Sequence, residues 1–556
     1  MNLKKRSPKI FRSVSSQVIG HRCFVNYKMQ LETRYLTAVE TQVIILYTYQ
    51  RNKYLPPSIS VSSYSPPLFT PNHGASFIML SSPRCLGCSL GLSEFESCAE
   101  VKLQALLDIT TQRILKSQGQ GSIIDSVSDK YFEKLYLISK WGCDGSSQQS
   151  EYKQVFNSEC DSDSSIFFTS VVPLQLVSGD IDGPNKIILW QNPRPSSPRY
   201  CRPIKIQFIH ETVDITLQEK VCIENQIEKL QPSIFHFNDT EIMVKHILMF
   251  TMIDGKLCNS VTSTKSAMKC YICGSTSKAF NKIEKMIDIK TNDLNLKFGL
   301  SILHAWIRFF ECLLHLSYKI GIKKWQARGD EEKRKVLENK KRIQEDFKSK
   351  LGLLVDIPKC GYGTSNDENT ARRFFENTEM SSSITGVDIE IINRFKIVLL
   401  TISSGYKIDL KKFNNYCILT AQKFVDKYPW YNMPTSVHKI LIHGTQIIEA
   451  LSILPIGQFS EESQEARNKD IKKYREGFSR KCSRIKNLED VFNRLLVSSD
   501  PLISSLRQLP QKKIKHIHPE VLEMILPPDI NRKTIKTKGT ESDISSENDV
   551  STSSSE

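Results

Sequence analysis

The chain has 556 residues, which is too long for one compact domain and predicts two to four structural units. Its composition, 40% hydrophobic and 24% charged, suits a soluble globular protein, and no charge-free apolar run is long enough to cross a bilayer. The net charge of +16 favours a polyanionic partner such as DNA or RNA, although solubility alone also explains a basic chain.

The first part of the chain predicts a separate N-terminal region. Residues 1–83 contain a Pro- and Ser-rich stretch, YLPPSISVSSYSPPLFTPNHG, so we expect a divergent and partly disordered region. The opening, MNLKKRSPKIFRSVSSQ, is basic and lacks acids, which favours a loose arm or a nuclear address over a transit peptide. Residues 84–134 predict a helical pre-core segment, because apolar residues recur at helical spacing through 96–117.

Residues 135–280 predict a β-rich core. Segments rich in β-forming residues follow one another along this part of the chain: KLYLISKW, SIFFTSVVPLQLV, KIILWQ and PIKIQFIHE. The run VKHILMFTMID is almost continuously apolar until Asp254, as expected of a buried central strand. The first of these strands leads into Asp144, so two predicted strands end beside a carboxylate.

The rest of the chain predicts mainly helices. Residues 281–455 place apolar side chains at a 3.6-residue period and include a charged helix, GDEEKRKVLENKKRIQEDFKSKLG, with Glu-to-Lys spacing suited to an exposed face. Helical segments over 456–490 and 491–525 follow, and the acidic, Ser-rich residues 526–556 predict a disordered tail. A β-rich half is therefore followed by a helical half.

Cys270 and Cys273 form a Cys-x-x-Cys pair, which can be a redox dithiol, part of a disulfide framework or half of a metal site. Fifteen scattered cysteines without a signal peptide indicate a reducing compartment and argue against disulfides. His438 and His443 complete a Cys2His2 set of the kind that binds zinc. Five helical positions leave two side chains about 140° apart, so convergence calls for a break or turn between these histidines. Two buried thiols and two unrelated histidines are the alternative.

Three strings of sequence resemble the Transib family of cut-and-paste DNA transposases, which is related to the catalytic subunit of the V(D)J recombinase. They are GKLCNSVTSTKSAMKCYICG, IILWQNPRPSSPRYCRP and PTSVHKILIHGTQIIEALSILPIGQFSEESQEARNK. The likeness covers roughly residues 85–525 and does not extend to residues 1–83. It implies an α/β fold, with a ribonuclease-H-like catalytic core and a large all-α insertion stabilised by zinc on Cys270, Cys273, His438 and His443.

The resemblance also implies a catalytic triad of Asp144, Asp254 and Glu465. The first Asp ends the first core strand, the second lies on an adjacent strand, and the Glu lies on a helix over 456–490 that returns after the insertion. The three carboxylates are expected to hold Mg2+ or Mn2+, because hard cations prefer carboxylate oxygens and strand cleavage uses two metals close together.

Other residues compete for these catalytic roles. Asp180 and Asp182 also follow a β-rich segment, and an Asp-Gly pair after a strand is a common turn signal in its own right. Glu461 and Glu462 compete with Glu465 on the last helix. His304 lies on a largely apolar helix and predicts a core histidine with satisfied hydrogen bonds.

The expected function is that of a transposase or recombinase with endonuclease activity, which cuts and joins DNA at terminal inverted repeats as a homodimer in the nucleus. The alternative is a non-catalytic, zinc-containing DNA-binding or scaffolding protein derived from a transposase. Polar and basic residues near the predicted site are expected to contact DNA: Arg372, Arg373, Arg467, Asn468, Lys469, Lys472 and Lys473.

Overall fold

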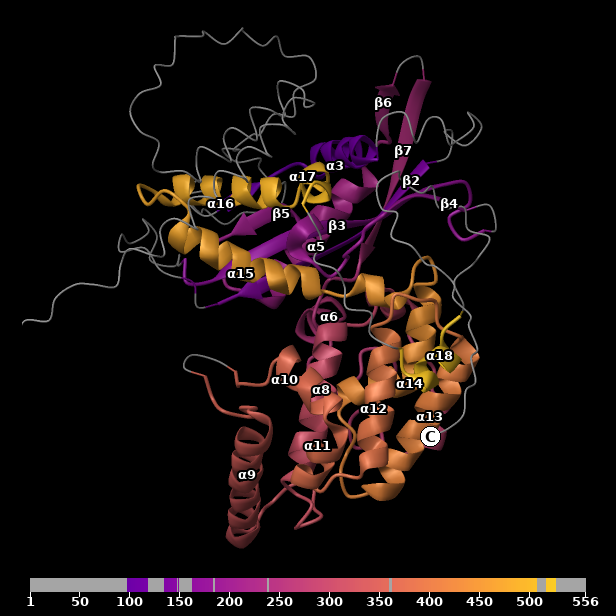
Figure 1. Cartoon of the computed structure of the whole chain (residues 1–556), viewed down its shortest axis with the longest axis vertical. Helices are drawn as coiled ribbons and strands as arrows, with labels where there is room; N and C mark the ends of the chain where they lie inside the picture. Colours follow the sequence, from indigo (N-terminus) through magenta and orange to yellow (C-terminus); the bar gives the residue numbers. More distant parts are fainter. Residues whose placement is uncertain are drawn as a thin grey trace, which may run out of the picture. The chain divides into compact units, whose positions relative to one another are not determined.

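The structure is a computed structural model that describes residues 98–118, 135–147, 149, 163–183, 186–237, 240–359, 363–507 and 517–526. The predicted N-terminal region 1–83 and residues 527–556 of the predicted tail lie outside the described residues. The described part is a mixed α/β fold, in which a curled sheet is followed by helices (Figure 1), so the predicted α/β class is confirmed. No helix in the described part is both long and apolar enough to span a membrane.

The described sheet has seven strands in the order β1-β5-β3-β2-β7-β6, with β4 paired to β3. Their bounds are β1 Cys98–Glu100, β2 Leu135–Ser146, β3 Ile166–Ser178, β4 Ile187–Gln191, β5 Arg202–Gln207, β6 Ser233–Phe237 and β7 Thr240–Phe250. All the pairings are antiparallel except that of β2 with β7, which is parallel. The ends of β2 and β7 therefore meet at the same edge of the sheet.

The sheet is stable because its strands carry apolar residues on the faces that other elements cover. Every residue of β3 is buried, as expected of a strand with elements on both faces. Trp141 of β2 stacks on Phe250 of β7 with ring centroids 4.2 Å apart, which joins the two parallel strands through their side chains. The helices of this part are α3 Leu103–Ser117, α5 Val213–Glu228, α6 Gly255–Val261, α16 Arg484–Ser498, α17 Pro501–Ser505 and the short η3 Pro198–Tyr200.

Several expected element boundaries were wrong. The helix expected over 96–117 begins at Leu103, because Cys98–Glu100 pairs with β5 as an edge strand. The strand expected to run to Asp254 ends at Phe250. The helical pattern expected within residues 281–455 is interrupted at Gly299, whose φ of 72° favours glycine, so that η4 Asp293–Phe298 ends before it and α8 Ile302–Ser317 begins after it. Helix α5 was not predicted, because it buries few apolar side chains and so lacks a clear helical pattern.

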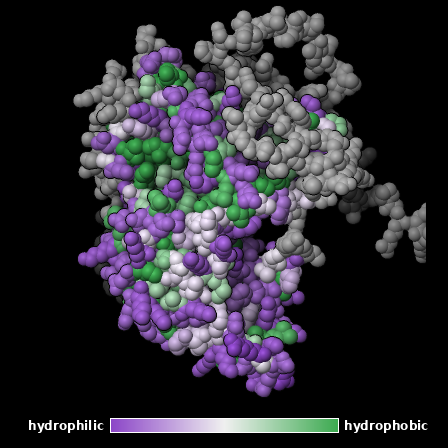
Figure 2. Space-filling view, turned by 180° about the vertical axis from the view of Figure 1, so that it is seen from behind, coloured by the Kyte–Doolittle hydropathy of each residue, from purple (hydrophilic) through white to green (hydrophobic). Residues whose placement is uncertain are grey.

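The helices from α7 to η5 lie on the side of the sheet edge where β2 and β7 end (Figure 1), and they cover residues 281–455, for which a helical insertion was predicted. They are α7 Ile283–Ile287, η4 Asp293–Phe298, α8 Ile302–Ser317, α9 Asp330–Leu351, α10 Glu368–Glu376, α11 Thr378–Thr385, α12 Ile389–Ile402, α13 Leu410–Lys427, α14 Thr435–Ala450 and η5 Ile456–Phe459. Aromatic side chains such as Phe309 and Phe395 join α8 to α12, with centroids 4.8 Å apart. The face shown in Figure 2 is largely hydrophilic over the lower part, which agrees with the apolar residues being buried.

Helix α15, Glu462–Gly477, returns from the insertion and lies along the sheet (Figure 1). Gln464 Nε2 donates to the carbonyl of Phe168 at 3.0 Å, and the buried Lys140 Nζ donates to the carbonyl of Ser460 at 2.6 Å. Helix α18, Pro519–Met524, then pairs back onto the insertion, where the amide of Asp409 donates to Met524 at 2.8 Å. The contacts of Ser460 and Gln464 therefore tie the start of α15 to the sheet, and α18 packs against the helices before it.

The close approach of β2 to the residues after β7 leads to a stability prediction. A Cβ atom on Gly142 would lie 1.9 Å from the carbonyl oxygen of Met252, so backbone would have to move. We expect Gly142→Ala to lower the free energy of unfolding by about 2 kcal/mol or more, measured in urea. Gly321→Ala is the control, because nothing lies within 4 Å of a Cβ there. Equal stability of the two variants would contradict this packing.

Candidate metal centre and acidic site

The four predicted zinc ligands come together. Cys270, Cys273, His438 and His443 each offer a ligand atom, and these atoms all lie within 4.8 Å of one another. The cysteines lie on a tight backbone turn, in which the amide of Gly274 donates to the carbonyl of Cys270 at 2.8 Å and Gly274 has a φ of 72°. A side chain other than hydrogen is disfavoured in that conformation, so glycine shapes the turn.

Both histidines belong to the continuous helix α14, so the break expected between them is absent. Their rings nevertheless lie 5.0 Å apart and nearly perpendicular, because each side chain swings toward the space between them. The ring of Phe280 stacks on His438 at 3.9 Å with an interplanar angle of 6°, which holds that imidazole in place. A straight helix therefore suffices for two ligands five positions apart.

The donor set fits a metal ion such as zinc. His443 Nδ1 lies 3.1 Å from Gln446 Oε1, and if it donates there, Nε2 offers its lone pair to a metal. His443 Nε2 is buried and has no hydrogen-bond partner, which is costly unless a ligand satisfies it. Hydrogen bonding from Cys270, followed by contacts with both histidines, lowers the pKa of Cys273 and favours a thiolate. Four protein ligands leave no open position, as in structural zinc sites.

The second group of interest is acidic and lies at the edge where β2 and β7 end. Asp144 lies in β2, three residues beyond Trp141, and Trp141 pairs with Phe250 at the end of β7. Asp254 follows Phe250 by four residues and is the N-cap of α6, where its Oδ1 accepts from the amide of Leu257 at 2.7 Å. The parallel pairing of β2 with β7 thus brings the segments that carry Asp144 and Asp254 to the same edge of the sheet.

Helix α15 adds a third carboxylate. Asn468 Nδ2 donates to Asp144 Oδ2 at 2.7 Å, which ties this helix to β2. Burial, together with the charges of Glu465, Asp254 and Glu211, raises the pKa of Asp144 well above its ordinary value. Burial and the charges of Glu461 and Asp254 likewise raise the pKa of Glu465. The charges of these carboxylates raise one another's pKa, although within the described residues only the Cys2His2 set has its ligand atoms close enough together to hold one ion.

The competing acids have other partners or lie elsewhere. Asp180 and Asp182 follow the end of β3, which pairs with the start of β2, so they lie at the opposite end from Asp144. Glu461 is 3% exposed and accepts hydrogen bonds from the amides of Ile302 at 3.1 Å and His304 at 3.3 Å, so it caps α8. Glu462 lies 3.5 Å from Arg372. Within the described part, no hydrogen bond or ion pair of the Glu465 side chain is seen, although its amide donates to the carbonyl of Glu461 at 3.3 Å.

Two residues near the acids were missed by sequence reasoning. His304, expected to be a core residue, is half-buried with Nδ1 3.1 Å from Glu461 Oε1. Burial alone would lower its pKa, but Glu461, and then Asp254 and Glu465, raise the pKa of His304 to about 9. Glu211 packs against Gly145, where a Cβ would meet its carboxylate oxygen at 2.6 Å. Neither His304 nor Glu211 lies in a recognisable sequence motif, because each contacts residues that are far away along the chain.

The predicted DNA-contacting residues divide into buried and exposed ones. Arg467 is 1% exposed and donates to Cys201 O at 3.2 Å and Ser498 Oγ at 2.9 Å, so its expected contact with DNA is wrong. Arg372 is half-buried over the ring of Trp306, 4.5 Å from its centroid. Arg373 is exposed and donates to the carbonyl of Leu351. The exposed cations on α15 are Lys469, Lys472 and Lys473.

The described residues define a mixed α/β protein with a Cys2His2 cluster that can hold a metal ion such as zinc. Comparison with protein-family models finds no match, and comparison with curated proteins finds none either. What the chain does has to be inferred from its own residues.

The Cys2His2 cluster predicts a measurable zinc content. Purified wild-type protein should hold about one zinc ion per chain, and the double variant Cys270→Ser/Cys273→Ser should lose it and unfold at a lower temperature, because the ion links the turn to α14. Elemental analysis and thermal unfolding provide the measurement. Cys482→Ser, at an exposed cysteine, should leave both unchanged. Full zinc content in the double variant would rule out these ligands.

The contact between His304 and Glu461 predicts a pH-dependent contribution to stability. Because the pKa of His304 is raised from 6.5 to about 9, the stabilisation is fully present below pH 6.5 and is lost as pH rises through 9. His304→Asn should cost on the order of 2 kcal/mol at pH 6 and much less at pH 10, measured by urea unfolding. In a Glu461→Gln background the same substitution should show little pH dependence. A cost that does not change with pH would contradict the pairing.

Proposed function

We propose that this protein is a transposase or recombinase of the Asp-Asp-Glu type, which cleaves and joins DNA strands at transposon ends with divalent metal ions. The observation that carries the proposal is the parallel pairing of β2 with β7, which brings Asp144 and Asp254 to one sheet edge, with Asn468 of α15 hydrogen-bonded to Asp144. A ribonuclease-H-like core is part of the proposal, since the first acid lies on the first long strand and the second follows the neighbouring strand.

Each residue near the acids has a physical task in this proposal. Mg2+ or Mn2+ held by Asp144, Asp254 and Glu465 would activate the attacking oxygen and stabilise the leaving oxygen. Asn468 donates a hydrogen bond to Asp144 Oδ2 and so orients the carboxylate, while Asp144 Oδ1 is not engaged by this contact. His304 contributes a positive charge that lowers the pKa of Glu465 and so favours its ionised form. A bound cation would offset the burial and charge repulsion that raise the pKa values of Asp144 and Glu465.

Basic residues on α15 support DNA as the substrate. Lys469 and Lys472 are exposed and lie four and seven positions after Glu465, on the same side of the helix. Phosphates bound there would run past the carboxylate. Cleavage at two DNA ends favours a two-fold assembly, so the proposal includes a homodimer. Because its substrate is DNA, we also propose that the protein acts in the nucleus.

A second function is supported by a separate observation. The Cys2His2 cluster and the basic face of α15 do not require catalysis, so a zinc-containing DNA-binding or scaffolding protein would keep both. The two functions differ in what the acids do. Only the enzyme requires Asp144, Asp254 and Glu465 to be ionised around metal ions.

The catalytic proposal predicts that Asp144→Asn abolishes cleavage while sparing DNA binding. The change removes one negative charge from a repelling cluster, so the folded protein should be at least as stable as wild type. Strand cleavage on a library of genomic inverted-repeat ends, with Mg2+ or Mn2+, should fall on the order of a thousandfold or more. Wild-type protein that binds these ends and cuts none with either metal would favour the scaffold.

Lys472→Ala is the contrasting variant for the same assay. It should weaken binding to all sequences and reduce the salt dependence of binding by about one counterion, because the lost contact is to phosphate. Its cleavage rate at saturating DNA should stay near wild type. A loss of cleavage without a loss of binding would assign Lys472 to the chemistry instead.

A further inference from the structure

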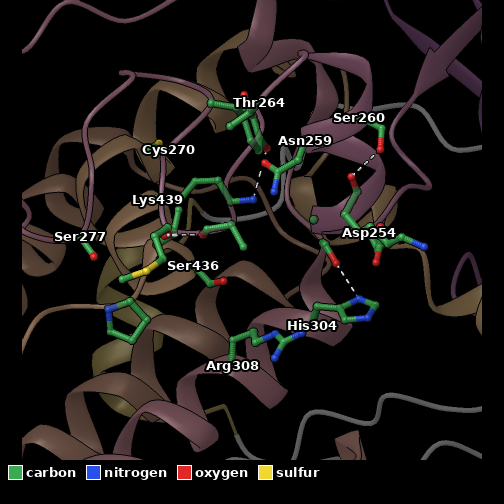
Figure 3. Close-up of a pocket in the computed structure, with 18 of the residues that line it drawn as sticks. Asp254, Asn259, Ser260, Thr264, Cys270, Ser277, His304, Arg308, Ser436 and Lys439 are labelled. Atoms are coloured by element: carbon green, nitrogen blue, oxygen red, sulfur yellow. Dashed lines mark hydrogen bonds between the residues drawn. The ribbon is translucent and has the colours of Figure 1, made fainter. Parts of the chain in front are cut away.

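A pocket of about 870 Å3 connects the acidic site to the Cys2His2 cluster (Figure 3). Asp254 and His304 line it on one side and Cys270 on the other (Figure 3), and Tyr271 is also among its lining residues. Its walls come from α6, α8, α14 and the segment between α6 and the cysteines. Nothing in the catalytic proposal above assigns a task to this space.

Basic side chains outnumber acids in the lining of the pocket. Asp254 is the acid among its lining residues, and the basic residues are Lys256, Lys265, Arg308 and Lys439. His304 also lines the pocket, paired with Glu461. Thr435 and Ser436, the first residues of α14, also line the pocket, and their helix begins without a side-chain cap. Such a lining attracts an anion.

Lys439 is the cation best placed to bind a ligand. It extends from α14 into the pocket (Figure 3), 4.9 Å from the centroid of the Tyr271 ring, and its Nζ donates to the Tyr271 hydroxyl at 3.2 Å. Within the described residues it has no carboxylate partner. Lys265 likewise has none there, whereas Lys256 pairs with Glu211 at 2.9 Å and Arg308 with Glu311 at 2.8 Å. Two cations of the pocket therefore remain available to an anion.

The volume of the pocket and the apolar residues of its lining indicate which class of ligand it can bind. The volume is that of a small-molecule site, which holds one or two nucleotides and is far too small for a duplex. Trp325 and Met268 add aromatic and apolar surface beside the cations, whereas Tyr271 is buried with its ring against Lys439. Cations that neutralise phosphate together with aromatic faces that accept bases are the combination that binds single-stranded nucleic acid.

We infer that this pocket holds a short single-stranded stretch of the DNA strand that runs past Asp254, with phosphates on Lys439 and Lys265. The inference rests on the proposed function, which identifies the bound strand as DNA. The free energy of binding the strand comes from the residues of the pocket. The strand lies between the acidic site and the Cys2His2 cluster, so the metal centre supports one wall of a binding site. Lys439 is adjacent in sequence to His438 and depends on that support.

The test uses the full-length protein without added divalent metal and two labelled probes, a six-nucleotide single strand and a blunt duplex. Lys265→Gln/Lys439→Gln should weaken binding of the single strand about tenfold or more and flatten its salt dependence by about one to one and a half counterions. Duplex binding should change less than about twofold. Lys285→Gln/Lys290→Gln, at exposed lysines outside the pocket, is the matched control.

Zinc content and thermal stability of the pocket variant must equal those of wild type, and Lys265→Gln alone, which leaves Lys439 beside His438 unchanged, provides a second reading if they do not. Equal loss on single strand and duplex, or no loss on either, would overturn the inference. Asp144→Asn should keep full single-strand binding. If no end is cut by wild type but single-strand binding depends on Lys439, the pocket is supported and the catalytic proposal alone fails.

Discussion

The attachment of α15 to the sheet is the constraint on which the rest of the structure depends. Lys140, buried in β2, gives its Nζ to the carbonyl of Ser460 just before this helix, and burial lowers its pKa to about 8. Breaking such a contact would leave an ammonium group without its acceptor inside the protein, which is costly. Gln464 and Asn468 continue the attachment along the next turns. The positions of the sheet edge, the acidic site and the insertion are therefore all set relative to α15.

The acidic site illustrates a conflict between stability and chemistry. Burial, and then the neighbouring carboxylates, raise the pKa values of Asp144 and Glu465, so each ionised group destabilises the folded protein near neutral pH. His304 and Asn468 offset part of this repulsion, one through charge and one through a hydrogen bond. Proteins keep such an arrangement where a cation or a reaction compensates for it.

Sequence alone predicted the parts of this molecule whose signals are local. The Cys-x-x-Cys turn and the histidine pair have a recognisable spacing, and their convergence is confirmed by the structure. The strands with dense β-branched residues were found, whereas α5 was missed because it buries few apolar groups. The expected break in α14 was wrong because helical geometry alone ignores how far a histidine side chain can reach.

Roles that depend on distant partners could not be predicted. His304 looks like a core residue until Glu461, 157 positions away, is placed beside it. Arg467 looks like a DNA contact within a charged helix, yet the carbonyl of Cys201 and the hydroxyl of Ser498 enclose it. A lone charged residue has no periodicity, so only the packing of the chain decides whether it faces solvent, a carbonyl or another charge.

The insertion has a consequence for how this chain is made. Ser463 at the start of α15 contacts Met252 at the sheet edge, 211 positions earlier. At ribosomal speeds the sheet edge therefore emerges about 10–40 s before the helix that covers it. During that interval the apolar residues around Met252 and the two cysteines lack the segments that later bury them. The nascent chain is exposed to chaperones, to premature metal capture and to aggregation until the last part of the insertion has left the ribosome.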